Sequence, residues 1–106
     1  MIDDASHLWS HQILSLKTLL PLLQPSGIFI LEDIHTSYAP LDATFNDAPQ
    51  DAATIACALA HLVIGGGRYH RSYAANPPTQ ELATLAGMID TVTLYRSPAL
   101  FVKKAR

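Results

Sequence analysis

The chain has 106 residues, of which 49% are hydrophobic and 15% are charged, and its formal net charge is −2. A chain of this length forms one domain rather than two, and this composition is too apolar and too weakly charged for a disordered protein. Seven Lys and Arg residues stand against nine Asp and Glu. This balance provides no basic stripe for a phosphate backbone, so we expect no nucleic-acid partner.

Cysteine content and hydropathy indicate the cellular compartment in which the protein is expected. No apolar run approaches the roughly 18 residues of a membrane span, so we expect no membrane partner. Residues 1–4 have neither the basic region nor the apolar core of a signal peptide. The single cysteine, Cys57, cannot form an internal disulfide, and its place on an alanine-rich segment predicts that it lies in the core. We therefore expect a cytoplasmic protein.

The first third of the chain alternates strand and helix patterns. Residues 2–4 resemble the end of a buried strand, and a helix follows, for which Ser6 and Ser10 are competing N-caps. Pro21 is expected to kink or end this helix. The run 27–31 is apolar on both faces, which predicts a strand inside a parallel sheet and a right-handed βαβ crossover. The helix is predicted from apolar residues at spacings of three and four, namely Trp9, Ile13, Leu16, Leu20 and Leu23.

The rest of the chain begins with a long segment, residues 34–48, that we predict to be a lid or binding loop. Three glycines at 65–67 are expected to end the helix before them. Lys103, Lys104 and Arg106 are expected to be solvated at the end of the chain. The elements predicted between these points are a helix, a short helix and two antiparallel strands, over residues 50–64, 80–86, 89–95 and 100–102.

Carboxylates follow both predicted parallel strands. Asp4 ends the first, and Glu32 and Asp33 end the second. Neighbouring strands lie about 4.8 Å apart, so these side chains can converge where ligands of open α/β sheets bind. Hard oxygen ligands favour Mg²⁺, Mn²⁺ or Ca²⁺ over zinc. The alternative is that the carboxylates cap loops and point into water.

A histidine stands at the start of the first predicted helix. A helix N-terminus disfavours imidazolium, so His7 would stay neutral and able to accept a proton, as a general base for a hydroxyl group must. The alternative is an ordinary surface residue of the first turn. His35 and Tyr38 follow the second strand and can line the same site, or they are ordinary loop residues.

Three segments, Ile2–His7, Leu19–Gly27 and Glu32–Tyr38, together with His11, resemble the C-terminal half of class I S-adenosylmethionine-dependent methyltransferases. The resemblance is specifically to the metal-dependent sugar O-methyltransferases of macrolide biosynthesis. It implies that Asp4, Glu32 and Asp33 hold Mg²⁺ or Mn²⁺ and that His7 is the general base on a sugar hydroxyl. S-adenosylmethionine is then the cofactor of the complete enzyme, and a small-molecule hydroxyl compound is its acceptor.

The same resemblance implies a fold. The chain would be the C-terminal half of a Rossmann-like α/β sheet, with strands 4 and 5 parallel around a crossover helix and strands 6 and 7 antiparallel. Residues 1–106 would form a single partial domain, a truncated form without the half that binds the cofactor. An unpaired sheet edge then favours a homo-oligomer. Ser26 replaces the first glycine of the family's Pro-Gly-Gly turn, which a type I turn tolerates.

Three functions follow from these patterns. The first is a metal-assisted O-methyltransferase of a sugar or natural-product hydroxyl. The alternative is a non-catalytic oligomerising or accessory half-domain, which self-association without cofactor binding would favour. The third is a non-haem iron oxygenase that uses His7, a carboxylate and His35, which iron-dependent oxygen consumption would favour.

Overall fold

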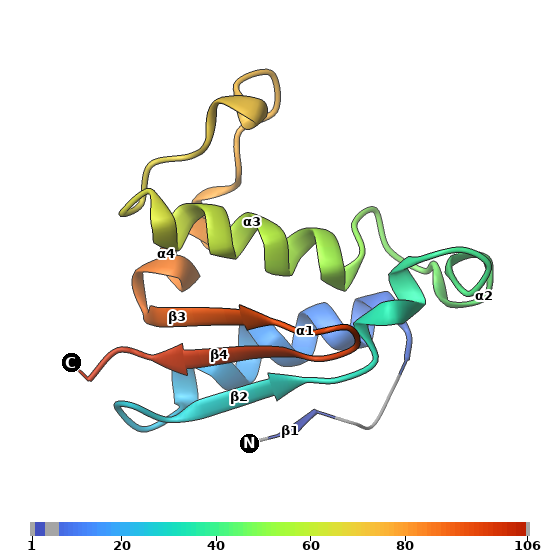
Figure 1. Cartoon of the computed structure of the whole chain (residues 1–106), viewed down its shortest axis with the longest axis horizontal. Coiled ribbons are helices and arrows are strands. Elements are labelled where there is room, and N and C mark those ends of the chain that lie inside the picture. The colour runs from blue at the N-terminus through green and yellow to red at the C-terminus, as the bar shows by residue number, and fades with distance from the viewer. Residues whose placement is uncertain (1, 4–6, 106) are drawn as a thin grey trace.

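A mixed sheet forms one layer of the molecule, and helices pack against one of its faces (Figure 1). The computed structural model describes residues 2–3 and 7–105. In this part of the chain the strand order is β1-β2-β4-β3. The strands are β1 (Ile2–Asp3), β2 (Ile28–Leu31), β3 (Ile89–Leu94) and β4 (Ala99–Lys103). The α-helices are α1 (Trp9–Leu19), α2 (Asp42–Phe45), α3 (Ala52–Ile64) and α4 (Gln80–Gly87), and the 3-10 helices are η1 (Leu20–Leu22), η2 (Ile34–Ser37) and η3 (Arg71–Tyr73).

Most of the strand pairing is antiparallel. β4 lies between β2 and β3 and pairs antiparallel with both. β1 pairs in parallel with β2 over two residues only, with Ile2 opposite Ile30. The closing antiparallel strands are therefore confirmed. The expectation for residues 27–31 holds only in part: β2 has the parallel β1 on one side, but the antiparallel β4 on the other, and Ile28 is 45% exposed.

The core lies between the sheet and the helices. Phe29 and Leu31 of β2 and Phe101 of β4 alternate with outward-facing neighbours, and all three side chains are fully buried. The rings of Phe29 and Phe101 lie 6.5 Å apart. Leu16 and Leu59, from α1 and α3, complete this layer. In Figure 1, α1 runs behind the strands and no helix lies in front of them. The opposite face of the sheet, which carries Ile28, is thus uncovered by the described helices.

The α-helix α1 ends just before Pro21, as predicted. α1 stops at Leu19 and continues as the 3-10 turn η1, which contains Pro21. The carbonyl groups of a helix end need donors from elsewhere. Lys103 supplies them, because its Nζ donates to the carbonyl oxygens of Pro21 at 2.8 Å and Leu23 at 2.7 Å. The expectation that Lys103 is solvated is therefore wrong.

The turn between η1 and β2 differs from its predicted form. Ser26 has a φ of 63°, in the left-handed region, so the type I turn expected here does not form. The N–H of Gly27 closes the turn on the carbonyl of Gln24 at 2.8 Å. A Cβ at Gly27 would lie 2.7 Å from that same oxygen, so glycine is required at this position.

The segment predicted as a loop, residues 34–48, contains η2 and α2. α3 begins at Ala52, with Asp51 as its N-cap, and ends at Gly65 as expected. Cys57 lies on the outer face of α3 and is exposed, so its predicted core position is wrong. The short helix over residues 80–86 is confirmed as α4. None of the helices in the described part of the chain is long and apolar enough to cross a membrane.

Candidate functional site

The 3-10 turn η2, which follows β2, gathers the predicted site residues that the structure describes. Asp33 precedes this turn with a φ of 59°, a left-handed conformation that aspartate tolerates better than most residues. The Nε2 of His7 donates to Asp33 Oδ2 at 2.9 Å. The Nδ1 of His35 lies 3.9 Å from Asp33 Oδ1 and 3.1 Å from the hydroxyl oxygen of Ser97. One carboxylate thus lies between two imidazoles.

The other predicted site residues are less tightly placed. Asp4 lies outside the described residues. Glu32 is half-buried at the end of β2. Tyr38 follows η2 and is 65% exposed. Among residues 2–3 and 7–105, no three His, Cys, Asp or Glu side chains gather as metal ligands.

The iron ligand set of the third hypothesis is not formed in this part of the chain. His7 and His35 approach opposite oxygens of Asp33, so their ring nitrogens do not converge on a common point with a carboxylate oxygen. A facial triad requires such convergence. The described residues therefore do not form the ligand set of the non-haem iron hypothesis.

A buried glutamine, which the sequence interpretation missed, supports this turn. Gln12 of α1 is fully buried, and its Nε2 donates to the carbonyl oxygens of Glu32 at 3.4 Å and Asp33 at 3.1 Å. Its Oε1 is buried and is without a hydrogen-bond partner among the described residues. The available signal was a polar residue on an apolar helical stripe, between Trp9 and Leu16.

Two further buried hydrogen bonds join the start of α1 to η2. The indole Nε1 of Trp9 donates to the carbonyl of Thr36 at 3.1 Å. The hydroxyl of Thr36 donates to the carbonyl of His7, also at 3.1 Å. Both side chains are buried. The two segments that carry His7 and Asp33 are therefore joined by further hydrogen bonds besides the one between these two side chains.

Residues 42–47, which we call the clasp, close over the start of α1. Ser10 does not cap α1; instead, its N–H donates to Asp47 Oδ1 at 2.9 Å and its hydroxyl donates to Oδ2 of the same carboxylate. Both bonds lower the pKa of Asp47 below its ordinary value, and the bond from the Ser10 hydroxyl has the larger effect. The ring of Phe45 lies 5.5 Å from the ring of His7. Asp47, 37 residues later in the chain, thus caps the start of α1 in place of Ser10, and the other expected cap, Ser6, lies outside the described residues.

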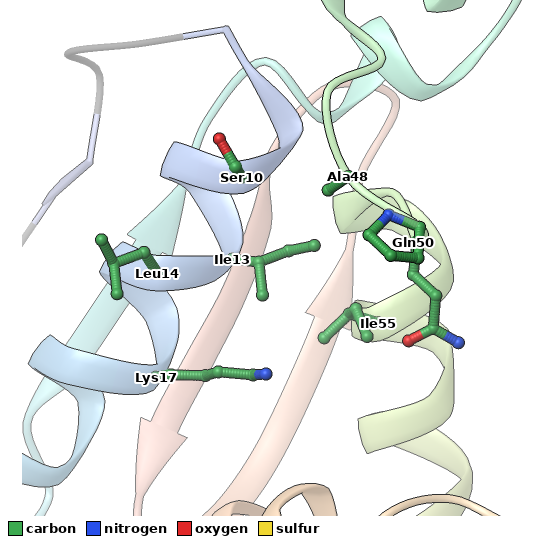
Figure 2. Close-up of a pocket in the computed structure, with 8 residues that line it drawn as sticks. Ser10, Ile13, Leu14, Lys17, Ala48, Gln50 and Ile55 are labelled. Atoms are coloured by element: carbon green, nitrogen blue, oxygen red, sulfur yellow. The ribbon is translucent and has the colours of Figure 1, made fainter.

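A separate hollow of about 340 Å³ lies between α1 and the segment that enters α3 (Figure 2). Ile13 points towards Ile55 across it, whereas the side chain of Leu14 points away from Ile55. Lys17 at its edge pairs with Glu81, with 2.5 Å between Nζ and Oε1. This hollow is mainly aliphatic, and none of the predicted site residues lines it.

Comparison with known proteins places this geometry in a context. No family model matches the chain. It is 34% identical over 92 residues to 8-demethyl-8-alpha-L-rhamnosyl tetracenomycin-C 2'-O-methyltransferase of Streptomyces olivaceus, a match that covers 84% of the chain and 23% of the relative. It is 40% identical over 40 residues to demethylmacrocin O-methyltransferase of Streptomyces fradiae and to mycinamicin VI 2''-O-methyltransferase of Micromonospora griseorubida, and each match covers 38% of the chain and 10% of the relative. The chain therefore spans less than a quarter of the length of these relatives. It is homologous to the sugar O-methyltransferases of natural-product biosynthesis, as its motifs predicted.

Proposed function

We propose that the chain carries the base-bearing part of an S-adenosylmethionine-dependent O-methyltransferase that acts on a sugar hydroxyl of a natural product. The observation that carries this proposal is the 2.9 Å hydrogen bond between His7 and Asp33 at the end of β2. Three relatives named as O-methyltransferases of glycosylated or macrolide-type compounds support it. Since the chain covers 23% of the first of them, the activity, cofactor and acceptor of the whole enzyme remain part of the proposal.

His7 is the proposed base. When its Nε2 carries the proton donated to Asp33, Nδ1 is left with a lone pair that can accept a proton from an acceptor hydroxyl. The carboxylate of Asp33 then stabilises the imidazolium that forms and fixes the ring in the productive tautomer. The ring of Phe45 restricts the orientation of the imidazole from its other side.

The proposed metal ligands are Asp4, Glu32 and Asp33, which would hold Mg²⁺ or Mn²⁺. Their oxygen donors are chemically suited to these ions. The described residues provide only part of such a set, because Asp4 lies outside them and no three ligands gather within them. When bound, the ion would supply Lewis-acid polarisation of acceptor oxygens. No step of the proton transfer to His7 depends on it.

His35 and Tyr38 are the proposed acceptor-facing residues. Both follow Asp33 on η2 or directly after it, and the phenol of Tyr38 is largely exposed to an incoming ligand. His35 is held by the hydroxyl of Ser97, from the turn between β3 and β4. The acceptor would therefore approach across η2.

We also propose that β1, β2, β3 and β4 correspond to strands 4 to 7 of a Rossmann-like methyltransferase sheet. The support is the parallel contact of β1 with β2 and the antiparallel position of β4 between β2 and β3. In this arrangement, the crossover helix is α1. The carboxyl ends of β1 and β2 then share one edge, where ligands of open α/β sheets bind.

The test is a methyl-transfer assay on the chain with S-adenosylmethionine, Mg²⁺ and a rhamnoside acceptor, together with calorimetric titration of the cofactor. We expect His7→Ala to lower the rate by about 10²- to 10⁴-fold, because this is the usual contribution of a general base. His70→Ala, in an exposed loop, is the matched control and should leave the rate unchanged. Equal rates for His7→Ala and the unsubstituted chain would contradict the proposal.

A second candidate function is a non-catalytic, self-associating accessory module. The uncovered face of the sheet favours it, because Ile28 is 45% exposed there and β1 provides a neighbour of only two residues at the edge of β2. Light scattering with size-exclusion chromatography would measure the mass. A stable dimer that neither binds the cofactor nor transfers methyl groups would favour this function over the first.

A further inference from the structure

A second hollow, of about 270 Å³, lies where three separate segments of the chain meet. Tyr38 borders it from the end of η2, Asp51 and Thr54 from the start of α3, and Tyr73 from η3. η2 connects Asp33 to this hollow, because Ser37, the last residue of η2, also lines it. Its volume is close to the lower end of the range of small-ligand pockets, about 300 Å³.

A carboxylate stands at one wall of this hollow. Asp51 Oδ2 accepts from the N–H of Thr54 at 2.9 Å, and Oδ1 accepts from the hydroxyl of Thr54 at 2.6 Å. Burial raises the pKa of Asp51, but these bonds and one from the hydroxyl of Ser37 outweigh it, so the pKa lies below its ordinary value. The group is thus ionised at neutral pH, and Asp51 lines the hollow as a hydrogen-bond acceptor.

Two tyrosines provide the other walls. Tyr38 is largely exposed, whereas Tyr73 is half-buried and its ring packs edge-on against His61 with centroids 5.5 Å apart. Aromatic rings of this kind offer an apolar face together with a polar tip. No Lys or Arg lines the hollow, so an anionic ligand has no counter-charge there. Phenol rings beside an ionised carboxylate suit a neutral ring that carries hydroxyl groups, because its hydroxyls donate to the carboxylate and its apolar face packs on the rings.

We infer that this hollow, bordered by Tyr38, Asp51 and Tyr73, is a subsite for a second hydroxylated ring of the acceptor, of sugar type. The identity of the occupant rests on the proposed function, since the acceptor of a glycoside-modifying enzyme extends beyond the hydroxyl that reacts. None of His7, Asp33 and His35 lines the hollow, so the second ring would lie apart from the one presented to His7.

Cys57 provides a direct test. It is the single cysteine of the chain, its side chain is exposed, and it lines this hollow. The measured quantity is the rate of Cys57 modification by a chromogenic disulfide reagent, with and without methyl α-L-rhamnopyranoside. At about ten times the dissociation constant of the probe, the rate should fall about tenfold, because only the unoccupied fraction reacts.

Four variants make the test specific. Tyr73→Ala and Asp51→Asn should abolish the protection, and asparagine preserves the N-cap of α3. Tyr95→Ala, another exposed tyrosine outside the hollow, should retain it. His7→Ala should also retain it, because binding in the hollow requires no proton transfer. Protection by the rhamnoside that survives both Tyr73→Ala and Asp51→Asn would overturn the inference.

Two further results separate the subsite from the proposed reaction. Equal protection by glycerol, which has hydroxyls and no ring, or no protection at any soluble concentration of the rhamnoside, would overturn the subsite. Protection in a chain that transfers no methyl group would support the subsite while the proposed function failed. Methyl transfer by a chain in which the rhamnoside leaves Cys57 unprotected would support the proposed function and overturn the subsite.

Discussion

Gln12 is a fully buried polar side chain, and its Nε2 donates to the backbone carbonyls of Glu32 and Asp33. A buried acceptor without a partner costs about 1–3 kcal/mol, and Gln12 Oε1 has none in the described part of the chain. Asp33 itself has a positive φ. Two unfavourable features thus coincide at the point where the carboxylate meets His7. We therefore expect Gln12 to be a positioning residue for this pair.

Replacement by methionine separates positioning from folding. Gln12→Met keeps the length of the side chain and removes both hydrogen bonds and the unpaired oxygen, so the free energy of unfolding should change by no more than about 1 kcal/mol. The His7–Asp33 bond should nevertheless loosen, and the ¹⁵N signals of the His7 ring should move toward a mixture of tautomers. Gln80→Met, on an exposed turn of α4, is the control. Unchanged His7 signals in Gln12→Met would show that Gln12 does not position the pair.

Single residues show which contacts can be anticipated from the sequence. The proximity of His7 and Asp33 could be anticipated because each lies at the end of a predicted element, where side chains meet a common edge, while their roles stay a prediction. Gln12, Trp9 and Thr36 could not be named, because their partners lie 20 or more residues away and local patterns do not encode such pairs.

Among the elements, the clasp differs most from its sequence expectation. α3, α4, β3 and β4 were predictable because each has a periodicity or alternation long enough to recognise. α2 is only four residues long, and η2 is equally short, so neither has such a signal. The hydrogen bond that the N–H of Ser10 donates to Asp47, 37 residues later in the chain, fixes the position of the clasp against α1.

The clasp should open in acid. Because the folded pKa of Asp47 lies below its ordinary value of 3.8, its stabilising contribution is complete above pH 3.8 and is lost as the pH falls through the folded pKa. The amide proton signal of Ser10, followed by NMR against pH, measures this loss. Asp47→Asn should abolish the titration, and Asp42→Asn in the same segment should not. A Ser10 signal that titrates identically in Asp47→Asn would contradict this assignment.

At the scale of the whole molecule, Lys103 ties the last strand to the end of the first helix. Its ammonium group reaches the carbonyls of Pro21 and Leu23, about 80 residues earlier in sequence. Hydrogen bonds from a charged donor contribute about 1.5–3 kcal/mol. Lys103→Met should therefore lower the free energy of unfolding in urea by about that amount. Lys104→Met, with an exposed side chain, should change it by less than about 0.5 kcal/mol, and equal effects of the two variants would refute the tie.

The position of β4 between β2 and β3 also affects how the molecule is made. β4 is synthesised after both of the strands that it pairs with, β2 and β3. Translation proceeds at about 5–20 residues per second, so the edge of β2 waits several seconds for the segment from Leu31 to Ala99 to emerge. During that interval the apolar edge formed by Phe29 and its neighbours is open to other chains and to chaperones. A longer interval before β4 emerges, or fewer chaperones, should therefore lower the amount of folded protein that a cell recovers.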